Sequence, residues 1–104
     1  MQDVTKQILE FTSERNWDQF HTPENLAKSI SIEAAELLEC YQWNSNGDIQ
    51  EIKEELADIM NYSLLLCSKL GLDPKEIILE KLEKNKAKYP VEKCFGKSDK
   101  YTKL

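Results

Sequence analysis

Two pairs of acidic residues at helical spacing constrain this chain more than any other feature of its sequence. Glu33 and Glu36 form the first pair, and Glu55 and Asp58 form the second. Residues three positions apart project from the same side of an α-helix, so each pair directs both of its carboxylates the same way. A short turn at residues 44–48 predicts that the second helix folds back antiparallel to the first. We therefore expect the four carboxylates to meet in the groove between two helices.

Four converging negative charges are stable only with a cation, and hard oxygen ligands of this kind favour Mg²⁺ or Mn²⁺. Acidic pairs at this spacing are common in a chain with 19 Asp and Glu residues, and most of them are solvated helix faces. Here, however, both pairs lie at the edges of apolar stripes on successive helices, which favours a metal site. A ferritin-like di-iron bundle would need Glu-x-x-His motifs, which this sequence lacks.

Apolar periodicity and capping residues predict an all-α, four-helix bundle-like fold. Asp3, Thr22, Asp48 and Asp73 are expected to cap the N-termini of four helices, and Pro23 and Pro74 suit the first helical position. Gly71 and Pro90 are expected to end helices. The helices are thus predicted within residues 3–16, 22–41, 48–70 and 73–90, and no segment has the period-two pattern of a strand.

Length and composition limit the possible classes of protein. A chain of 104 residues is expected to form one domain, 1–104, with residues 91–104 as a basic tail. A net charge of −5 argues against binding to nucleic acid polymers, and no apolar run approaches the ~20 residues of a membrane span. The N-terminus is too polar for a signal peptide, and three scattered cysteines indicate reduced thiols, so we expect a cytoplasmic protein.

The third predicted helix also carries an indication of self-association. Residues 63–67 read Ser-Leu-Leu-Leu-Cys, which is apolar on nearly every side of a helix. Such a segment is expected to be buried all round, and so few helices are not expected to enclose it in a monomer. A symmetric dimer is the simplest prediction.

Several other side chains are candidates for ligand contacts, although each also has a structural interpretation. Trp17 and Trp43 flank the carboxylate segment, either as core residues or as the walls of a pocket that stacks a nucleobase. His21 and Tyr62 are equally compatible with loop packing and with ligand contact. On the apolar side of the fourth helix, Lys81 and Asn85 interrupt the pattern; a buried amide such as Asn85 needs hydrogen-bond partners. A non-enzymatic helical interaction module explains the same apolar and charged residues.

The ordered combination of these motifs resembles a known family. The Glu33-x-x-Glu36 and Glu55-x-x-Asp58 pairs are similar to the signature of the MazG-like, all-α nucleoside triphosphate pyrophosphohydrolases. Three further segments, at residues 14–27, 36–43 and 81–90, resemble the branch of that family that contains dCTP pyrophosphatase. The resemblance extends over residues 5–100, nearly the whole chain.

The resemblance implies hydrolysis of an NTP or dNTP to the monophosphate and pyrophosphate, dependent on Mg²⁺ with Mn²⁺ as a substitute, in a nucleotide-pool cleaning role. It also implies assembly as a dimer or a dimer of dimers. A phosphoribosyl-ATP pyrophosphohydrolase activity is an alternative within the same superfamily. The turn at residues 42–52 is short compared with longer-loop relatives, which leaves the base preference open.

The resemblance further implies a role for each candidate residue. The implied metal ligands are Glu33, Glu36, Glu55 and Asp58. Lys81 and Asn85 match positions that contact phosphates, Lys81 by stabilising charge on the leaving pyrophosphate. The implied base pocket comprises Trp17, His21, Trp43 and Tyr62. For the general base that accepts the proton of the attacking water, Glu36 and its neighbour Glu39 are the candidates.

Overall fold

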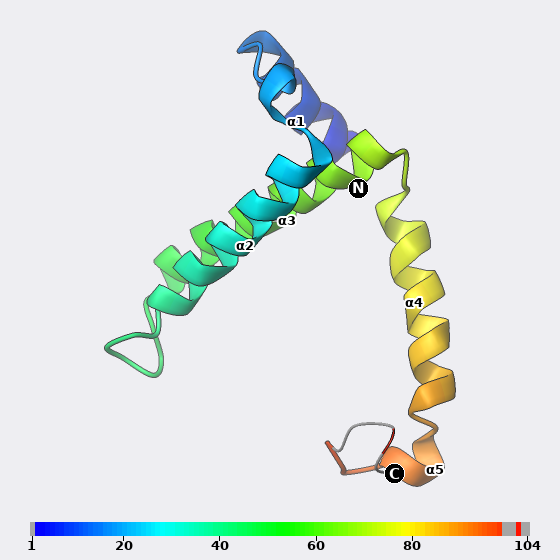
Figure 1. Ribbon diagram of the computed structural model, residues 1–104. Coiled ribbons are helices and arrows are strands. Elements are labelled where there is room, and N and C mark those ends of the chain that lie inside the picture. Colours follow the sequence, from blue (N-terminus) through cyan, green and yellow to red (C-terminus); the bar gives the residue numbers. More distant parts are fainter. Residues whose placement is uncertain (1, 99–101, 103–104) are drawn as a thin grey trace. The chain divides into compact units, whose positions relative to one another are not determined.

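The computed structural model describes residues 2–98 and 102, and every regular element in this part is a helix (Figure 1). The predicted all-α fold is confirmed. The elements, in chain order, are α1 (Gln2–Glu14), the short 3₁₀-helix η1 (Asp18–Phe20), α2 (Pro23–Glu39), α3 (Ile49–Leu70), α4 (Pro74–Lys88) and α5 (Val91–Cys94).

The capping residues explain where most of these helices begin and end. The side chains of Thr22, Asp48 and Asp73 accept hydrogen bonds from backbone N–H groups in the first turns of α2, α3 and α4. Gly71 ends α3 with a left-handed φ of 67°, a conformation that glycine adopts without a steric cost. The prediction for Asp3 was wrong: α1 already begins at Gln2, so Asp3 lies in its first turn, where its charge still complements the helix dipole.

The chain divides into two compact units, residues 1–72 and 73–104, and each is described by itself. In the first unit, α2 and α3 lie side by side and antiparallel along their length (Figure 1), joined by the turn that the sequence predicts. α1 packs against α3. The most deeply buried side chains are Leu26 of α2, Leu64 and Leu65 of α3, and Thr12 of α1. The first unit therefore supplies its own small core.

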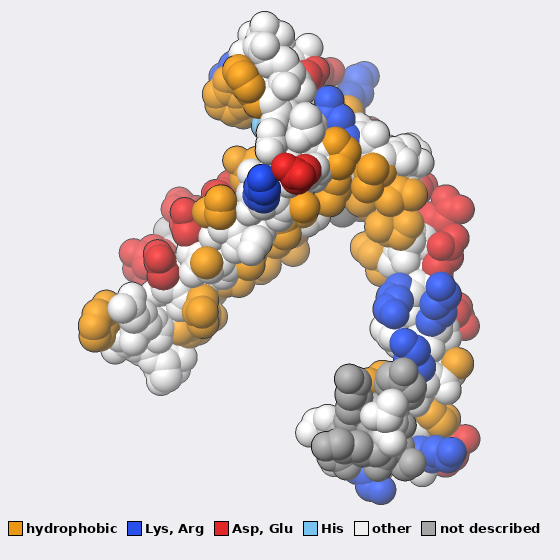
Figure 2. All heavy atoms as spheres, viewed as in Figure 1, with side chains coloured by type: hydrophobic (Ala, Val, Ile, Leu, Met, Phe, Trp, Pro, Cys, Tyr) orange, Lys and Arg blue, Asp and Glu red, His pale blue; other side chains and the backbone are white. Residues whose placement is uncertain are grey.

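This core corrects one argument for self-association. Leu64 and Leu65 are only 5% and 4% exposed within the single chain, so the inference that they need a second subunit for burial was wrong. Leu66 and Cys67 are half-buried. Apolar side chains remain exposed elsewhere in the unit, and Figure 2 shows hydrophobic groups on the surface along the α2–α3 pair. Examples on these two helices are Ile32, Leu38, Ile49, Leu56 and Met60.

The second unit consists of α4, α5 and the residues that follow. α4 exposes Ile78, Leu79 and Leu82, and lysines gather towards its C-terminal end (Figure 2). The one-turn helix α5 falls within the predicted tail, where no helix was expected, because only the preceding Pro90 marks its start. Two lysines of the predicted basic tail, at positions 100 and 103, lie outside the described residues.

Candidate active site

Three of the predicted metal ligands converge between α2 and α3. Each of Glu33, Glu55 and Asp58 offers a carboxylate oxygen within 4.8 Å of the oxygens of the other two. Glu33 comes from α2, whereas Glu55 and Asp58 lie one helical turn apart on α3. The antiparallel pairing of α2 with α3 brings these acids together, because each pair occupies the edge of an apolar stripe that packs against the opposite helix.

Glu36 completes the cluster through its interactions with its neighbours. Burial raises the pKa of Glu33 to about 7, and the neighbouring carboxyl groups of Glu36 and Asp58 add to the shift. The carboxyl group of Glu36 likewise raises the pKa of Glu55, and desolvation adds to that shift. Carboxyl groups this close favour protonation because two anions cannot share the space without strong repulsion. All four predicted acids therefore interact electrostatically.

The polar atoms of the cluster fit a divalent cation. Oε2 of Glu33 and Oε2 of Glu55 are buried, and neither has a hydrogen-bond partner among the residues that the structure describes. Buried polar atoms are normally satisfied, so two unpaired carboxylate oxygens that face a third carboxylate indicate a missing positive partner. Mg²⁺ and Mn²⁺ accept this set of oxygen donors.

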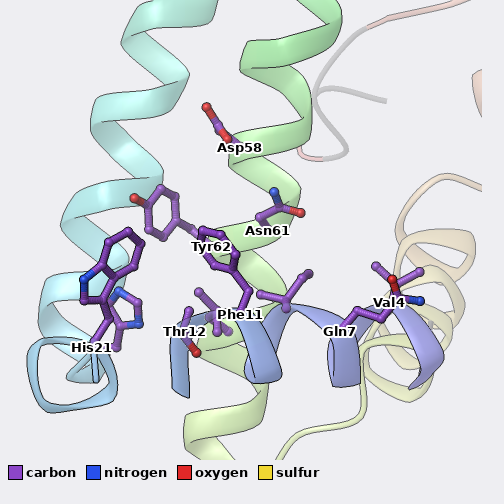
Figure 3. Close-up of a pocket in the computed structure, with 11 residues that line it drawn as sticks. Val4, Gln7, Phe11, Thr12, His21, Asp58, Asn61 and Tyr62 are labelled. Carbon is purple, nitrogen blue, oxygen red and sulfur yellow. The ribbon is translucent and has the colours of Figure 1, made fainter. Parts of the chain in front are cut away.

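A pocket of about 390 Å³ adjoins the cluster through Asp58. Figure 3 shows Asp58 at one end of this pocket, with Asn61 and Tyr62 next along α3 and Phe11 and His21 towards the other end. The floor is formed by α1. The lining residues are Val4, Gln7, Ile8, Phe11, Thr12, Trp17, His21, Asp58, Asn61, Tyr62 and Leu65. The pocket thus combines one acidic end with mainly apolar and aromatic walls, the usual character of a small-molecule site.

The segment that carries Trp17 and His21 is held by local hydrogen bonds. The buried Thr12 hydroxyl lies 3.0 Å from the Leu9 carbonyl oxygen and 3.2 Å from Oδ1 of Asp18, and donates to these acceptors. The backbone N–H of Trp17 donates to the Thr12 carbonyl. These bonds fasten the start of η1 to the end of α1, and they fix the part of the pocket wall that the loop supplies.

Aromatic contacts complete this wall. The rings of Phe11 and Trp17 meet edge to face, with centroids 5.5 Å apart. His21 makes a similar, longer contact of 6.4 Å with Tyr62 of α3. Burial raises the pKa of Tyr62, as do the negative charges of Glu33 and Asp58, so its hydroxyl remains protonated next to the cluster. The Nδ1 atom of His21 is buried and has no hydrogen-bond partner among residues 2–98.

Other predicted site residues lie outside this pocket. Trp43 is 90% exposed in the turn after α2 and does not line the pocket, so the two tryptophans do not form facing walls within one chain. Glu39 is exposed at the last position of α2 and lies outside the group of three carboxylates. Lys81 and Asn85 lie on α4 in the second unit, and their phosphate contacts stay a prediction.

The sequence reasoning missed several lining residues. Gln7, Ile8 and Phe11 of α1 and Asn61 of α3 line the pocket but were not among the predicted site residues. Asn61 lies three positions after Asp58, the same spacing that identified the acidic pairs. Extending that spacing by one turn would have indicated that Asn61 shares the face of α3 that carries the site.

The chain is similar to one known family and to several named proteins. Residues 28–104 match the MazG-like family. The dCTP pyrophosphatase 1 proteins of Rattus norvegicus and Homo sapiens are each 32% identical to the chain, in an alignment that covers 100% of this chain and 67% of each relative. A crystal structure of a pyrophosphatase from Archaeoglobus fulgidus is similar with a TM-score of 0.81 and 41% identity, covering 86% of this chain and 92% of that one.

The chain therefore belongs to the MazG-like family. The predicted resemblance and the all-α fold are confirmed. The names of the relatives support the predicted class of enzyme, a nucleotide pyrophosphohydrolase. Among the described residues, no helix is both long enough and apolar enough to span a bilayer.

Proposed function

We propose that this protein is a Mg²⁺-dependent nucleoside triphosphate pyrophosphohydrolase that converts dCTP, or a related or modified nucleotide, to the monophosphate and pyrophosphate. The observation that carries the proposal is the group of three carboxylates, Glu33, Glu55 and Asp58, at the end of a pocket large enough for a nucleoside. The relatives named dCTP pyrophosphatase 1 support the choice of substrate.

In this proposal the four acids hold the metal that binds the triphosphate. A bound divalent cation neutralises phosphate charge and makes a water molecule more acidic, which suits attack on the α-phosphorus. Glu36 borders the three closest carboxylates, so it would hold the metal through one carboxylate oxygen and accept the proton of that water through the other. Glu39 is the less favoured base, since it is exposed at the end of α2.

The pocket residues orient the nucleoside. Trp17 offers an aromatic ring for stacking and Phe11 packs edge to face against it, while the unpaired Nδ1 of His21 offers a hydrogen bond to the nucleotide. Tyr62 spans the region between the acids and this aromatic end. Lys81 and Asn85 of α4 are proposed to contact the phosphates, Lys81 by stabilising the leaving pyrophosphate.

We also propose that the enzyme acts as a dimer or a dimer of dimers in the cytoplasm. Exposed apolar residues on α2 and α3, together with Trp43 in the connecting turn, provide hydrophobic surface that a second copy of the chain can cover. The three cysteines, Cys40, Cys67 and Cys94, are free thiols, which suits a reducing compartment. Sedimentation should show an oligomer, and a stable monomer at micromolar concentration would contradict the proposal.

Product analysis tests the proposed reaction. The purified protein should be assayed with Mg²⁺ on a panel of common and modified NTPs and dNTPs, with the products separated and identified. We expect dCMP and pyrophosphate from dCTP, and no turnover when a chelator removes the metal. Release of inorganic phosphate would indicate another kind of NTPase. Absence of turnover on every nucleotide would leave a helical interaction module and refute the proposal.

A further inference from the structure

Asn61 lines the pocket and has no role in the proposed reaction. Its side chain is exposed on α3, and the described residues give it no hydrogen-bond partner. An amide offers both a donor and an acceptor. The Thr12 hydroxyl is engaged within the protein and Asp58 belongs to the metal cluster, whereas the second amide of the pocket, Gln7, lies on α1, farther from the acids than Asn61 (Figure 3).

The order of residues along the pocket determines which part of a nucleotide Asn61 can reach. Asp58 lies at the acidic end, and the next turn of α3 towards α1 carries Asn61 and Tyr62, with Tyr62 on the side of His21 and Asn61 on the side of Gln7 (Figure 3). Asn61 follows Asp58 by three positions, which is a rise of ~4.5 Å along the helix. In a nucleotide, the pentose is the group that lies between the phosphates and the base.

We infer that Asn61 recognises the sugar of the substrate by a hydrogen bond between its side-chain amide and the 3′-hydroxyl. The inference rests on the proposed function, since it assumes that the phosphates lie at the acidic end of the pocket. The 3′-hydroxyl is present in both ribonucleotides and deoxyribonucleotides, so this contact accepts either sugar. It disfavours a nucleotide that lacks the 3′-hydroxyl, because the amide is then covered by the ligand without a partner.

Dideoxy-CTP, which lacks the 3′-hydroxyl, allows a direct test against dCTP. For the wild-type enzyme with Mg²⁺ we expect kcat/KM to be roughly five- to tenfold higher for dCTP than for dideoxy-CTP, the effect of one hydrogen bond between uncharged groups. In Asn61→Leu the two nucleotides should become equivalent, through loss of activity on dCTP rather than a gain on dideoxy-CTP. Gln50→Leu is the matched control, since this exposed amide of α3 binds Glu54 outside the pocket, and it should retain the wild-type ratio.

The outcomes separate the two proposals. Equal activity of the wild type on dCTP and dideoxy-CTP, or an unchanged ratio in Asn61→Leu, would refute the role of Asn61 while the hydrolase activity stands. An equal loss on both nucleotides in Asn61→Leu would also refute it, because a purely structural defect does not depend on the sugar. If the wild type hydrolyses no nucleotide, the proposed function fails first, and the role of Asn61 fails with it.

Discussion

The carboxylate cluster and the loop that carries Trp17 and His21 border the same pocket, yet they differ in how many of their hydrogen bonds form within the chain. In the cluster, buried oxygens of Glu33 and Glu55 lack hydrogen-bond partners within the described chain, and the pKa of each carboxyl is raised. In the loop, side chains and backbone bond to one another: Gln19 donates to the Asn16 carbonyl, as Thr12 does to Asp18. The buried Nδ1 of His21 also lacks a partner, but the hydrogen bonds that hold the loop form without a ligand, whereas the acids of the cluster have no positive partner among the described residues.

This difference indicates how the two regions contribute to binding. A wall whose hydrogen bonds are already made is pre-organised, so the ordering of the loop costs little when a ligand arrives. A cluster of mutually repelling acids is instead stabilised by the cation that it binds. We therefore expect substitutions in the cluster to affect chemistry and metal binding, and substitutions in the loop to affect mainly nucleotide affinity and stability.

Glu55→Gln is expected to have the largest effect. It removes a charged ligand but no apolar volume, so kcat/KM should fall about a hundredfold or more while the helical content is unchanged. Glu51→Gln, an exposed acid one turn earlier on α3, is the matched control and should retain activity. Circular dichroism and steady-state kinetics with Mg²⁺ provide the readouts. Retained turnover in Glu55→Gln would remove this residue from the set of ligands.

Trp17→Ala should produce the largest effect within the loop. Loss of a stacking ring from the pocket wall is expected to raise KM for dCTP by about tenfold with a smaller change in kcat. Phe20→Ala is the control, because Phe20 is an exposed aromatic residue of η1 that does not line the pocket. If both variants raise KM equally, the effect arises from the loop as a whole and not from stacking on Trp17.

Thr12→Val tests whether the loop is held by its hydrogen bonds. Valine has nearly the same shape but lacks the hydroxyl that contacts Asp18, so the free energy of unfolding should fall by about 1 kcal/mol and KM should rise modestly. Thr12→Ser retains the hydroxyl and should preserve more of the loop's function, which nucleotide titration and chemical denaturation can measure. A serine variant as impaired in KM as the valine variant would show that the methyl group, not the hydroxyl, positions the wall.

The pH dependence of stability should show the smallest effect, and its sign follows from Glu33. The pKa of this carboxyl is about 7 in the folded protein, above its ordinary value of 4.5. Between pH 4.5 and pH 7 the folded state therefore binds more protons than the unfolded state. When a chelator keeps the protein free of metal, the free energy of unfolding should therefore fall as the pH rises from about 4.5 to 7. Glu33→Gln should reduce this slope when both proteins are unfolded in denaturant across that range. An identical slope in the variant would assign the pH dependence to other groups.

The sequence predicted those parts of the structure that local interactions determine. The side chains of Thr22, Asp48 and Asp73 bond to backbone N–H groups within three residues. The starts of α2, α3 and α4 could therefore be predicted from the local sequence. The convergence of the acids was also predictable, because an antiparallel helix pair with two apolar stripes has few ways to pack. Asp3 failed as a cap because capping residues also suit the first turn of a helix.

The remaining features depend on contacts that are distant in sequence. The pocket arises because α1 packs on α3, and no periodicity within either helix indicates that Gln7 and Asn61 then line one cavity. Trp43 was predicted as a pocket wall by resemblance, but the chain alone leaves it exposed in a turn. Whether a tryptophan lies in a core, a pocket or an interface is decided by what packs against it, which residue type alone does not specify.

Titration of Mn²⁺ into the metal-free protein tests the central claim, that the acids between α2 and α3 form a divalent cation site, without relying on catalysis. Binding can be followed by calorimetry and by electron paramagnetic resonance at neutral pH. We predict saturable binding to the wild type and to Glu51→Gln, and strongly weakened binding to Glu55→Gln and Glu33→Gln. Equal binding by all four proteins, or none by the wild type, would contradict the claim.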